Sequence, residues 1–154
     1  MVVVTTVAGD ERSGCLVGFH SQASIDPPRY AVWISKANHT YGVGLHAEHF
    51  AVHLLTVDDH DLAELFGSLT GDDVDKFERC DWRSGPGGVP LIDRLPRRIV
   101  GRRTSLTDDG SDHVCVVVEP VQVDGDEAQP FAPLRLHAVT DVDPGHEADE
   151  GRAS

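Results

Sequence analysis

The segment from Ser35 to Thr40 has the residue types and the spacing of a site for a phosphate-bearing ligand. It reads Ser-Lys-Ala-Asn-His-Thr and directly follows an apolar run, residues 30–35, that predicts a strand. Because Asn38 and Thr40 are good helix caps, a helix is expected from here to about residue 47. The first N–H groups of a helix lack internal partners and attract anions. Further hydroxyl, ammonium and amide donors would come from the side chains of Ser35, Lys36, Asn38 and Thr40. These residues would serve equally well as plain caps and solvated groups, so both interpretations stay open.

The pair Asp112-His113 is a second place where the residue types could do chemistry. It precedes an apolar run, Val114 to Val118, that predicts a buried strand. Histidine donates or accepts a proton near neutral pH, and a strand would fix its ring. We therefore take His113 as the candidate catalytic residue, with a strand-end histidine that binds nothing as the alternative.

Other patterns give less support for a site. His46, His49 and His53 invite a metal assignment, but their spacing does not match HExxH and the third lies in a predicted strand, so no metal is expected. The glycine-rich stretch 85–88 matches neither GxGxxG nor GxxxxGK[ST], which disfavours those nucleotide loops. No GxSxG is present, which disfavours a covalent hydrolase. The arginines between residues 94 and 103 could meet an anionic substrate or form surface ion pairs.

The composition is that of a globular protein with a strong negative charge. The chain has 154 residues, 13 basic and 26 acidic, for a formal net charge of −13. Nucleic acid is not expected as a partner, because binding it requires a basic surface. The three cysteines are widely spaced, which predicts a reduced, cytoplasmic protein. The apolar run at residues 1–6 is too short for a membrane span and lacks the basic flank of a signal peptide.

Most of the chain has the pattern of strands. Runs rich in β-branched residues predict strands at residues 2–7, 13–24, 30–35, 50–55, 98–105, 113–123 and 134–139. A second helix is expected from Asp58 to Phe66, and a short helical turn from Thr70 to about Phe77. Strands at both ends of the chain favour a mainly β fold, a closed or split barrel with short helices. Residues 1–141 should form one domain, followed by an acidic solvated tail at 142–154.

Several landmarks, taken in order from Val2 to Val123, resemble the flavin reductase-like family, whose fold is the FMN-binding split barrel. They are the opening strand VVVTT, the loop ending SIDPPRY, the strand and helix start WISKANHTY, then FAVHLL, DLAELFG, DKFERCDW, GVPLI and SDHVCVVVEPVQV. No single landmark is decisive, so the resemblance depends on their order and spacing.

The resemblance implies a homodimer that binds FMN, or less often FAD, and passes a hydride from NADH or NADPH to the flavin. A partner monooxygenase could take up the electrons. By the same resemblance, segment 35–40 holds the flavin phosphate and ribityl chain, and the loop before Asp26 lies against the ring. That loop consists of Leu16, Val17, Gly18, Phe19, His20 and Ser21. Lys76, Phe77 and His113 fall at positions near the flavin or the nicotinamide.

One departure from the family pattern concerns the ring loop. Many relatives carry Thr or Ser where this chain has Leu16, Gly18 and Phe19. Backbone N–H groups, helped by His20, Ser21 or Gln22, would then have to replace the missing hydroxyls. The departure motivates an alternative, in which the same barrel is a non-catalytic module for a flavin, haem or deazaflavin.

Overall fold

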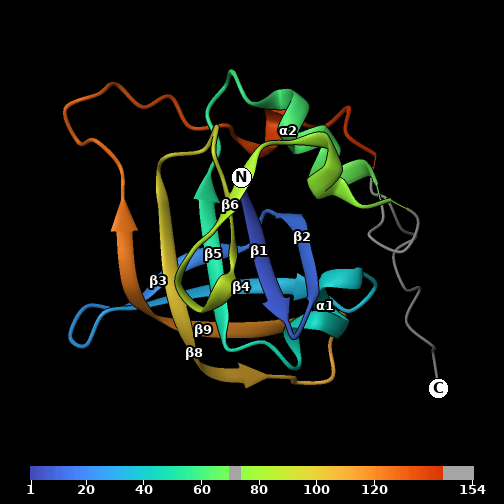
Figure 1. Cartoon of the computed structure of the whole chain (residues 1–154), viewed down its shortest axis with the longest axis vertical. Coiled ribbons are helices and arrows are strands. Elements are labelled where there is room, and N and C mark those ends of the chain that lie inside the picture. The colour runs from blue at the N-terminus through green and yellow to red at the C-terminus, as the bar shows by residue number, and fades with distance from the viewer. Residues whose placement is uncertain (70–73, 144–154) are drawn as a thin grey trace.

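A curled antiparallel sheet is the central feature of the computed structural model, which describes residues 1–69 and 74–143 (Figure 1). The sheet has seven strands in the order β2-β1-β5-β8-β9-β4-β3. Their bounds are β1 Val2–Ala8, β2 Glu11–Val17, β3 His20–Ser24, β4 Arg29–Ser35, β5 His49–Leu54, β8 Arg98–Thr107 and β9 His113–Asp124. A separate hairpin pairs β6 (Trp82–Ser84) with β7 (Pro90–Ile92). This order makes neighbours of strands that are far apart in the chain, above all β4 and β9.

Short helices connect the strands. The helix α1 (His39–Gly44) follows β4, and α2 (His60–Ser68) follows β5. The described residues also contain three 3-10 turns: η1 Lys76–Arg79, η2 Pro86–Gly88 and η3 Leu136–Ala138. The amphipathic α2 buries Leu62, Ala63 and Phe66. None of the helices in the described residues is long and apolar enough to cross a membrane.

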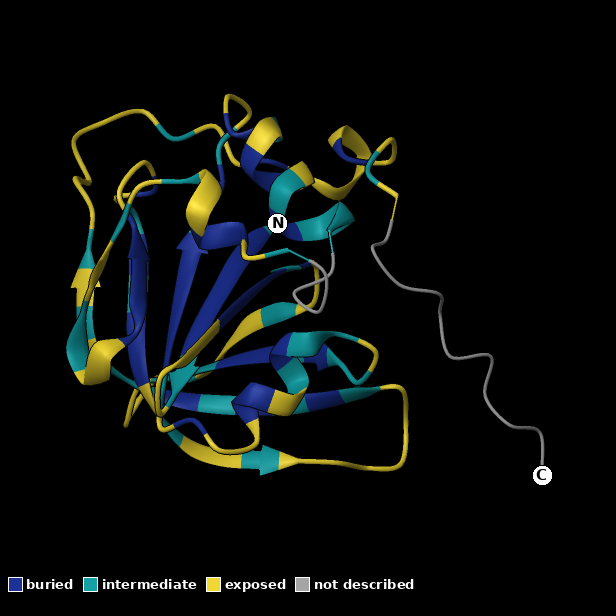
Figure 2. Ribbon diagram, turned by 45° about the vertical axis from the view of Figure 1, so that its right-hand side comes forward, coloured by how far each residue is buried: buried dark blue, intermediate teal, exposed yellow. Residues whose placement is uncertain are grey.

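Among the described residues the buried apolar side chains form three clusters, and the two larger ones lie on either side of the strand β1 (buried residues are dark blue in Figure 2). Side chains alternate along a strand, so Val2 and Val4 enter one core and Val3 enters the other. The first core fills the curled sheet and includes Cys15, Val17, Val32, Ile34, Phe50, Val52, Val114, Val116 and Val118. The second lies under α2 and includes Leu55, Leu62, Phe66, Phe77, Ile92, Leu95, Leu134 and Val139. Burial on both faces explains why the strand begins with three consecutive valines.

The predicted fold class, a mainly β split barrel with short helices, is confirmed. The long segment 13–24 is two strands, β2 and β3, because the chain turns at Gly18 and Phe19. The helix after Asn38 ends at Gly44, earlier than expected, and the Asn38 side chain makes no capping hydrogen bond. The start of the predicted helical turn at Thr70 lies outside the described residues, and η1 follows it.

The strand predicted at residues 134–139 is wrong. The backbone of Leu134 accepts a hydrogen bond from the Met1 amine at 2.7 Å, and its N–H donates to the Leu55 carbonyl at 2.9 Å. The chain then turns through η3 and buries Val139. A turn, unlike a strand, lets both apolar residues reach the core under α2.

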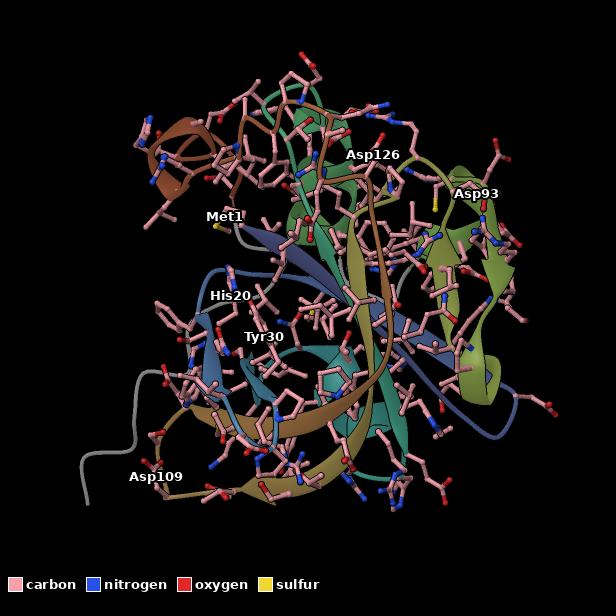
Figure 3. All side chains as sticks on the ribbon, turned by 90° about the vertical axis from the view of Figure 1, so that its left-hand side faces the viewer. Met1, His20, Tyr30, Asp93, Asp109 and Asp126 are labelled. Carbon is pink, nitrogen blue, oxygen red and sulfur yellow. The ribbon has the colours of Figure 1, made fainter. Side chains whose placement is uncertain are left out.

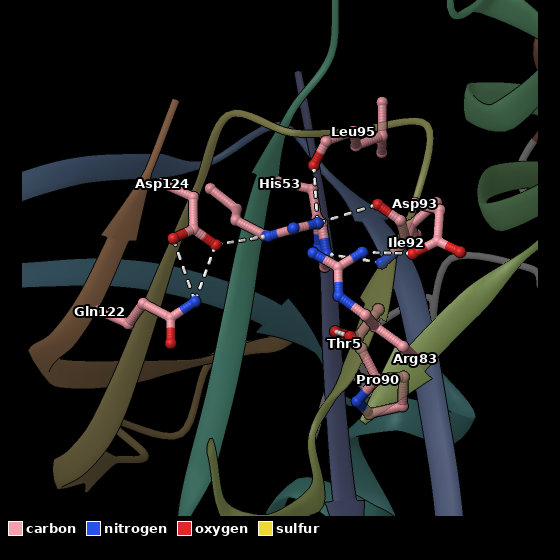
Figure 4. Close-up of polar contacts among 10 residues, drawn as sticks. Thr5, His53, Arg83, Pro90, Ile92, Asp93, Leu95, Gln122 and Asp124 are labelled. Carbon is pink, nitrogen blue, oxygen red and sulfur yellow. Dashed lines mark hydrogen bonds and ion pairs between the residues drawn. The ribbon is translucent and has the colours of Figure 1, made fainter. Parts of the chain in front are cut away.

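A buried polar cluster fastens the β6–β7 hairpin to the sheet (Figure 4). The fully buried His53 donates through Nδ1 to the Val3 carbonyl at 3.1 Å and accepts at Nε2 from the Ile92 N–H, also at 3.1 Å. Arg98 donates to the carbonyls of Ile92 and Leu95 at 3.0 and 3.1 Å, and to Asp124 at 2.9 Å. Since both ring nitrogens of His53 are occupied, its imidazole is held neutral as a structural link. Among the described residues, no three His, Cys, Asp or Glu side chains are arranged to hold a metal.

We expect His53 to make the protein sensitive to acid. The pKa of His53 is lowered to about 3, mainly by burial; the Val3 hydrogen bond opposes this shift and the Arg98 charge adds to it. In the unfolded chain the pKa is about 6.5, so between these values only the unfolded state binds the proton. The free energy of unfolding should therefore fall as the pH drops from about 6.5 towards 3, by up to about 1.4 kcal/mol per pH unit.

Urea unfolding of the wild type and of His53→Gln between pH 7 and pH 4 tests this expectation. The variant should be less stable at pH 7, because two buried backbone groups lose their partner. Its stability should fall less steeply with acid, since glutamine does not titrate. His137→Gln, which removes an exposed histidine, is the control and should keep the wild-type slope. Parallel curves for wild type and His53→Gln would contradict the assignment.

Close packing requires a glycine at position 101. A Cβ there would overlap the Val118 side chain and lie 3.2 Å from the Glu119 carbonyl oxygen. Gly101→Ala should therefore lower the free energy of unfolding by about 1–3 kcal/mol, measured by urea denaturation. Gly42→Ala is the matched control, because nothing lies within 4 Å of its added Cβ and it is helical. That variant should gain about 0.5–1 kcal/mol; equal losses would refute the packing argument.

Candidate functional site

A cavity of about 260 Å³ opens where the ends of β2 and β4 meet the start of β9 and the end of α2. It gathers residues that are distant in the sequence. The lining consists of Met1, Leu16, Val17, Gly18, Phe19, Trp33, Ser35, Ala37, Asn38, Phe66, Gly67, Asp112, His113 and Val142. Candidates from the ring loop, from segment 35–40 and from the Asp112-His113 pair therefore share one hollow.

The pairing of β4 with β9 brings these segments together. Ser35 lies directly opposite His113, and Trp33 lies opposite Cys115. Residues opposite each other in an antiparallel pair share a face, so Trp33, Ser35 and His113 all point to the outer side. Their neighbours Ile34 and Val114 point inward to the core. The Lys36 N–H also donates to the Asp112 carbonyl at 2.8 Å, so a hydrogen bond joins the residue after β4 to the residue before β9.

One end of the cavity is polar. Asp112 accepts a hydrogen bond from Nδ1 of His113 at 2.8 Å, and this contact lowers the pKa of Asp112. The bond orients the imidazole and fixes which nitrogen carries the hydrogen. Ser35 accepts a hydrogen bond from the Ala37 N–H at 3.3 Å. The Asn38 side chain is not used as a helix cap, so its amide remains for the cavity.

The other walls of the cavity are apolar and are closely packed at Gly67. Leu16, Val17 and Phe66 supply aliphatic and aromatic surface. Trp33 is half-buried at the base of the same face. Gly67 has no space for a side chain, since a Cβ would lie 2.9 Å from Leu16 and 3.1 Å from Val142. The arrangement suits a flat, largely apolar ring that carries a polar tail.

The structure divides the expected phosphate segment into two parts. Ser35 and Asn38 line the cavity, whereas Lys36 and Thr40 do not. The Lys36 ammonium donates to Asp108 at 2.7 Å, and this hydrogen bond raises the pKa of Lys36. Thr40 is buried, and its hydroxyl is hydrogen-bonded to that of Ser13 at 2.8 Å. Thr40 thus holds α1 against β2 and faces the interior.

His20 and Ser21 lie on the edge strand β3, beside the cavity and not in its lining. His20 is hydrogen-bonded through Nδ1 to the Tyr30 hydroxyl at 2.7 Å, and Figure 3 shows the pair at the edge of the sheet. Burial lowers the pKa of His20, which favours the neutral ring. Ser21 is exposed and donates to the carbonyl of Gln22 at 2.9 Å.

Lys76 and Phe77 line a neighbouring cavity of about 430 Å³, together with residues 10–14, His39, Val74 and Asp75. Lys76 is buried, and its ammonium donates to the Gly14 carbonyl at 3.1 Å and to the Phe66 carbonyl at 3.0 Å. Burial lowers the pKa of Lys76. The two cavities adjoin along β2, because Gly14 borders one and Leu16 the other.

Sequence reasoning missed several lining residues. Trp33 could have been found, because strand alternation places it with Ser35 on one face of β4. Phe66 and Gly67 follow from the helix prediction only once the position of α2 is known. Met1 and Val142 carried no signal, since they reach the cavity through long-range packing.

Comparison with known proteins gives the family. Residues 1–140 match the model of the flavin reductase like domain. The FMN reductase (NADH) SmoA of Agrobacterium fabrum is 30% identical over 129 residues, which cover 82% of this chain and 71% of that protein. The stachydrine N-demethylase reductase subunit Stc3 of Rhizobium meliloti is 28% identical over 118 residues, covering 74% of this chain. The chain spans about half the length of that second relative.

Solved structures show the same fold. The NADH:FAD oxidoreductase SgcE6 of Streptomyces globisporus superimposes with a TM-score of 0.75 at 25% identity, covering 87% of this chain and 83% of that one. Since the family model spans nearly the whole chain and agrees with the observed barrel, the chain belongs to the flavin reductase-like family.

Proposed function

We propose that the protein binds FMN, with FAD as the variant ligand, in the cavity between β2, β4, β9 and α2, and that it oxidises NADH or NADPH there. The observation that carries this proposal is the shared cavity, which unites ring-loop residues with Ser35, Asn38 and His113. A bound flavin would supply the acceptor for the hydride of the reduced nicotinamide. The protein's own task is to bind and orient both ring systems.

The residues present fit a flavin. An isoalloxazine ring is flat and mostly apolar, which matches the walls formed by Leu16, Val17 and Phe66. The polar tail suits Ser35 and Asn38 at the other end. The volume of about 260 Å³ holds only part of such a ligand, so the adjoining cavity with Lys76 and Phe77 would receive the rest. The Lys36 ammonium would add a cation near the cavity if it released Asp108 and bound the phosphate instead.

His113 is the proposed catalytic residue. Asp112 holds its Nδ1–H, so Nε2 is the nitrogen left to meet a ligand. With its hydrogen on Nδ1, the ring would accept a hydrogen bond at Nε2 from a ligand N–H, such as that of the nicotinamide carboxamide, and so orient the nicotinamide. His20 and Ser21 lie on the edge strand β3 and would approach the ligand only from outside the cavity.

The relatives support the chemistry and suggest partners. One is named an FMN reductase (NADH) and another an NADH:FAD oxidoreductase, so both flavins and NADH belong in the proposal. A third is the reductase subunit of a demethylase, which supports delivery of electrons to a partner monooxygenase. We further propose a homodimer, a cytoplasmic location and a domain of residues 1–141. Val142, the first residue of the expected tail, still packs against the core, and residues 144–154 of that tail lie outside the described residues. The non-catalytic module is not favoured, since these relatives are named as reductases or oxidoreductases.

Flavin binding can be followed through Trp33. The chain has two tryptophans, and Trp82 packs against Phe77 and Arg12 instead of lining the cavity. In a Trp82→Phe background, FMN should quench the fluorescence of Trp33. Ser35→Ala or Asn38→Ala should raise the Kd about fivefold, the value of one hydrogen bond. Ser84→Ala, an exposed serine on β6, is the control and should leave the Kd unchanged. Saturating absorbance changes without any quenching would place the flavin elsewhere.

Catalysis can be followed by anaerobic stopped-flow mixing of the FMN-loaded protein with NADH or NADPH. The flavin absorbance should bleach on a catalytic timescale. His113→Gln should slow the bleaching about 3- to 10-fold, because it replaces the oriented imidazole with a weaker hydrogen-bonding group. His137→Gln serves as the control. Flavin binding without bleaching would turn the proposal into that of a binding module.

A further inference from the structure

Phe19 is a large aromatic residue in an unusual setting. Its side chain is 61% exposed at the turn between β2 and β3, yet it is not an isolated surface residue. The ring lines the cavity and contacts the ring of His113, with centroids 5.3 Å apart and planes tilted by 57°. One side of the phenyl ring is therefore supported, while much of its surface still faces solvent.

The backbone fixes this position. The Phe19 carbonyl accepts a hydrogen bond from the Trp33 N–H at 2.9 Å, which ties the turn to β4. On the other side of the contact, Asp112 orients His113 and the β4–β9 pairing places it opposite Ser35. The phenyl and imidazole rings thus form a preorganised pair, and little side-chain freedom would be lost on stacking.

The chemistry of the pair points to a particular class of ligand. An exposed, uncharged phenyl surface favours a second flat ring, worth more than its buried area alone. The adjacent imidazole adds one hydrogen-bonding nitrogen, Nε2, beside that surface. A flat heteroaromatic ring that carries a carboxamide satisfies both. The apolar walls of the cavity at Leu16 and Phe66 remain for the flavin ring.

We propose that Phe19 determines affinity for the pyridine nucleotide by stacking on its nicotinamide ring at the mouth of the flavin-loaded cavity. The inference rests on the proposed function and adds the residue that selects the second substrate.

Equilibrium binding to the FMN-loaded protein tests the inference without turnover. NAD⁺ is used because its ring is aromatic and cannot donate a hydride, and ADP-ribose is used because it lacks the nicotinamide. Calorimetry should show that Phe19→Ser raises the Kd for NAD⁺ about 3- to 10-fold, the range expected for the loss of one aromatic stack. Phe19→Tyr should bind as the wild type does, and Phe19→Leu should lie between. The Kd for ADP-ribose should not change in any variant.

Ile25→Ser is the matched control, since Ile25 is 85% exposed and does not line the cavity. It should leave every Kd unchanged, and thermal unfolding should confirm that all variants are folded. Phe19 would be a flavin contact, and the inference overturned, if Phe19→Ser weakened FMN and left NAD⁺ unaffected. Equal Kd values for NAD⁺ in wild type and Phe19→Ser would also overturn it, while leaving the flavin proposal intact. A wild type that binds no flavin would refute both.

Discussion

The pairing of β4 with β9 is the constraint on which the site depends. Its register puts Val32, Ile34, Val114 and Val116 into the core, and it puts Trp33, Ser35 and His113 on the outer face. A shift by one residue would exchange the two sets, exposing the apolar side chains and burying the polar ones. Hydrophobic burial therefore selects the same register that assembles the cavity. The free energy gained by burying the apolar side chains of β4 and β9 therefore also places the residues of the site, and no separate interaction is needed to position them.

Polar groups in the interior serve a different purpose from those of the cavity. His53 and Arg98 join the β6–β7 hairpin to the sheet, and each is surrounded by partners within the protein. Within the described residues, no buried side-chain nitrogen or oxygen lacks a hydrogen bond. Asn38 and His113, by contrast, border open space. The distinction separates histidines and amides that hold the fold from those that are available to a ligand.

Much of the architecture could be read from the sequence, because alternating and β-branched runs are local signals. The strands β1, β4, β5, β8 and β9 and the helix α2 were all predicted near their observed positions. Residues 134–139 misled because Leu134 and Val139 have the apolar character of a strand but are buried through a turn. The short β6 and β7 carry too few residues for a pattern. The cavity lining includes residues that were expected from the sequence, namely Leu16, Val17, Gly18, Phe19, Ser35, Asn38 and His113. Their contacts with a ligand stay a prediction. Thr40 and Lys76 could not be judged, because only packing shows that both side chains are buried and engaged.

The placement of Lys76 has an electrostatic consequence for an anionic ligand. The carbonyl groups at the end of α2 carry the negative end of the helix dipole, and Phe66 and Gly67 bring that end to the cavity wall. The Lys76 ammonium, 3.0 Å from the Phe66 carbonyl, counters this partial charge from within the protein. A chain with a formal charge of −13 would otherwise repel a phosphorylated cofactor at short range. The buried amine thus makes the electrostatic potential at the cavity wall less repulsive to an anionic ligand. Because Lys76 is buried, it does so without placing a cation on the protein surface.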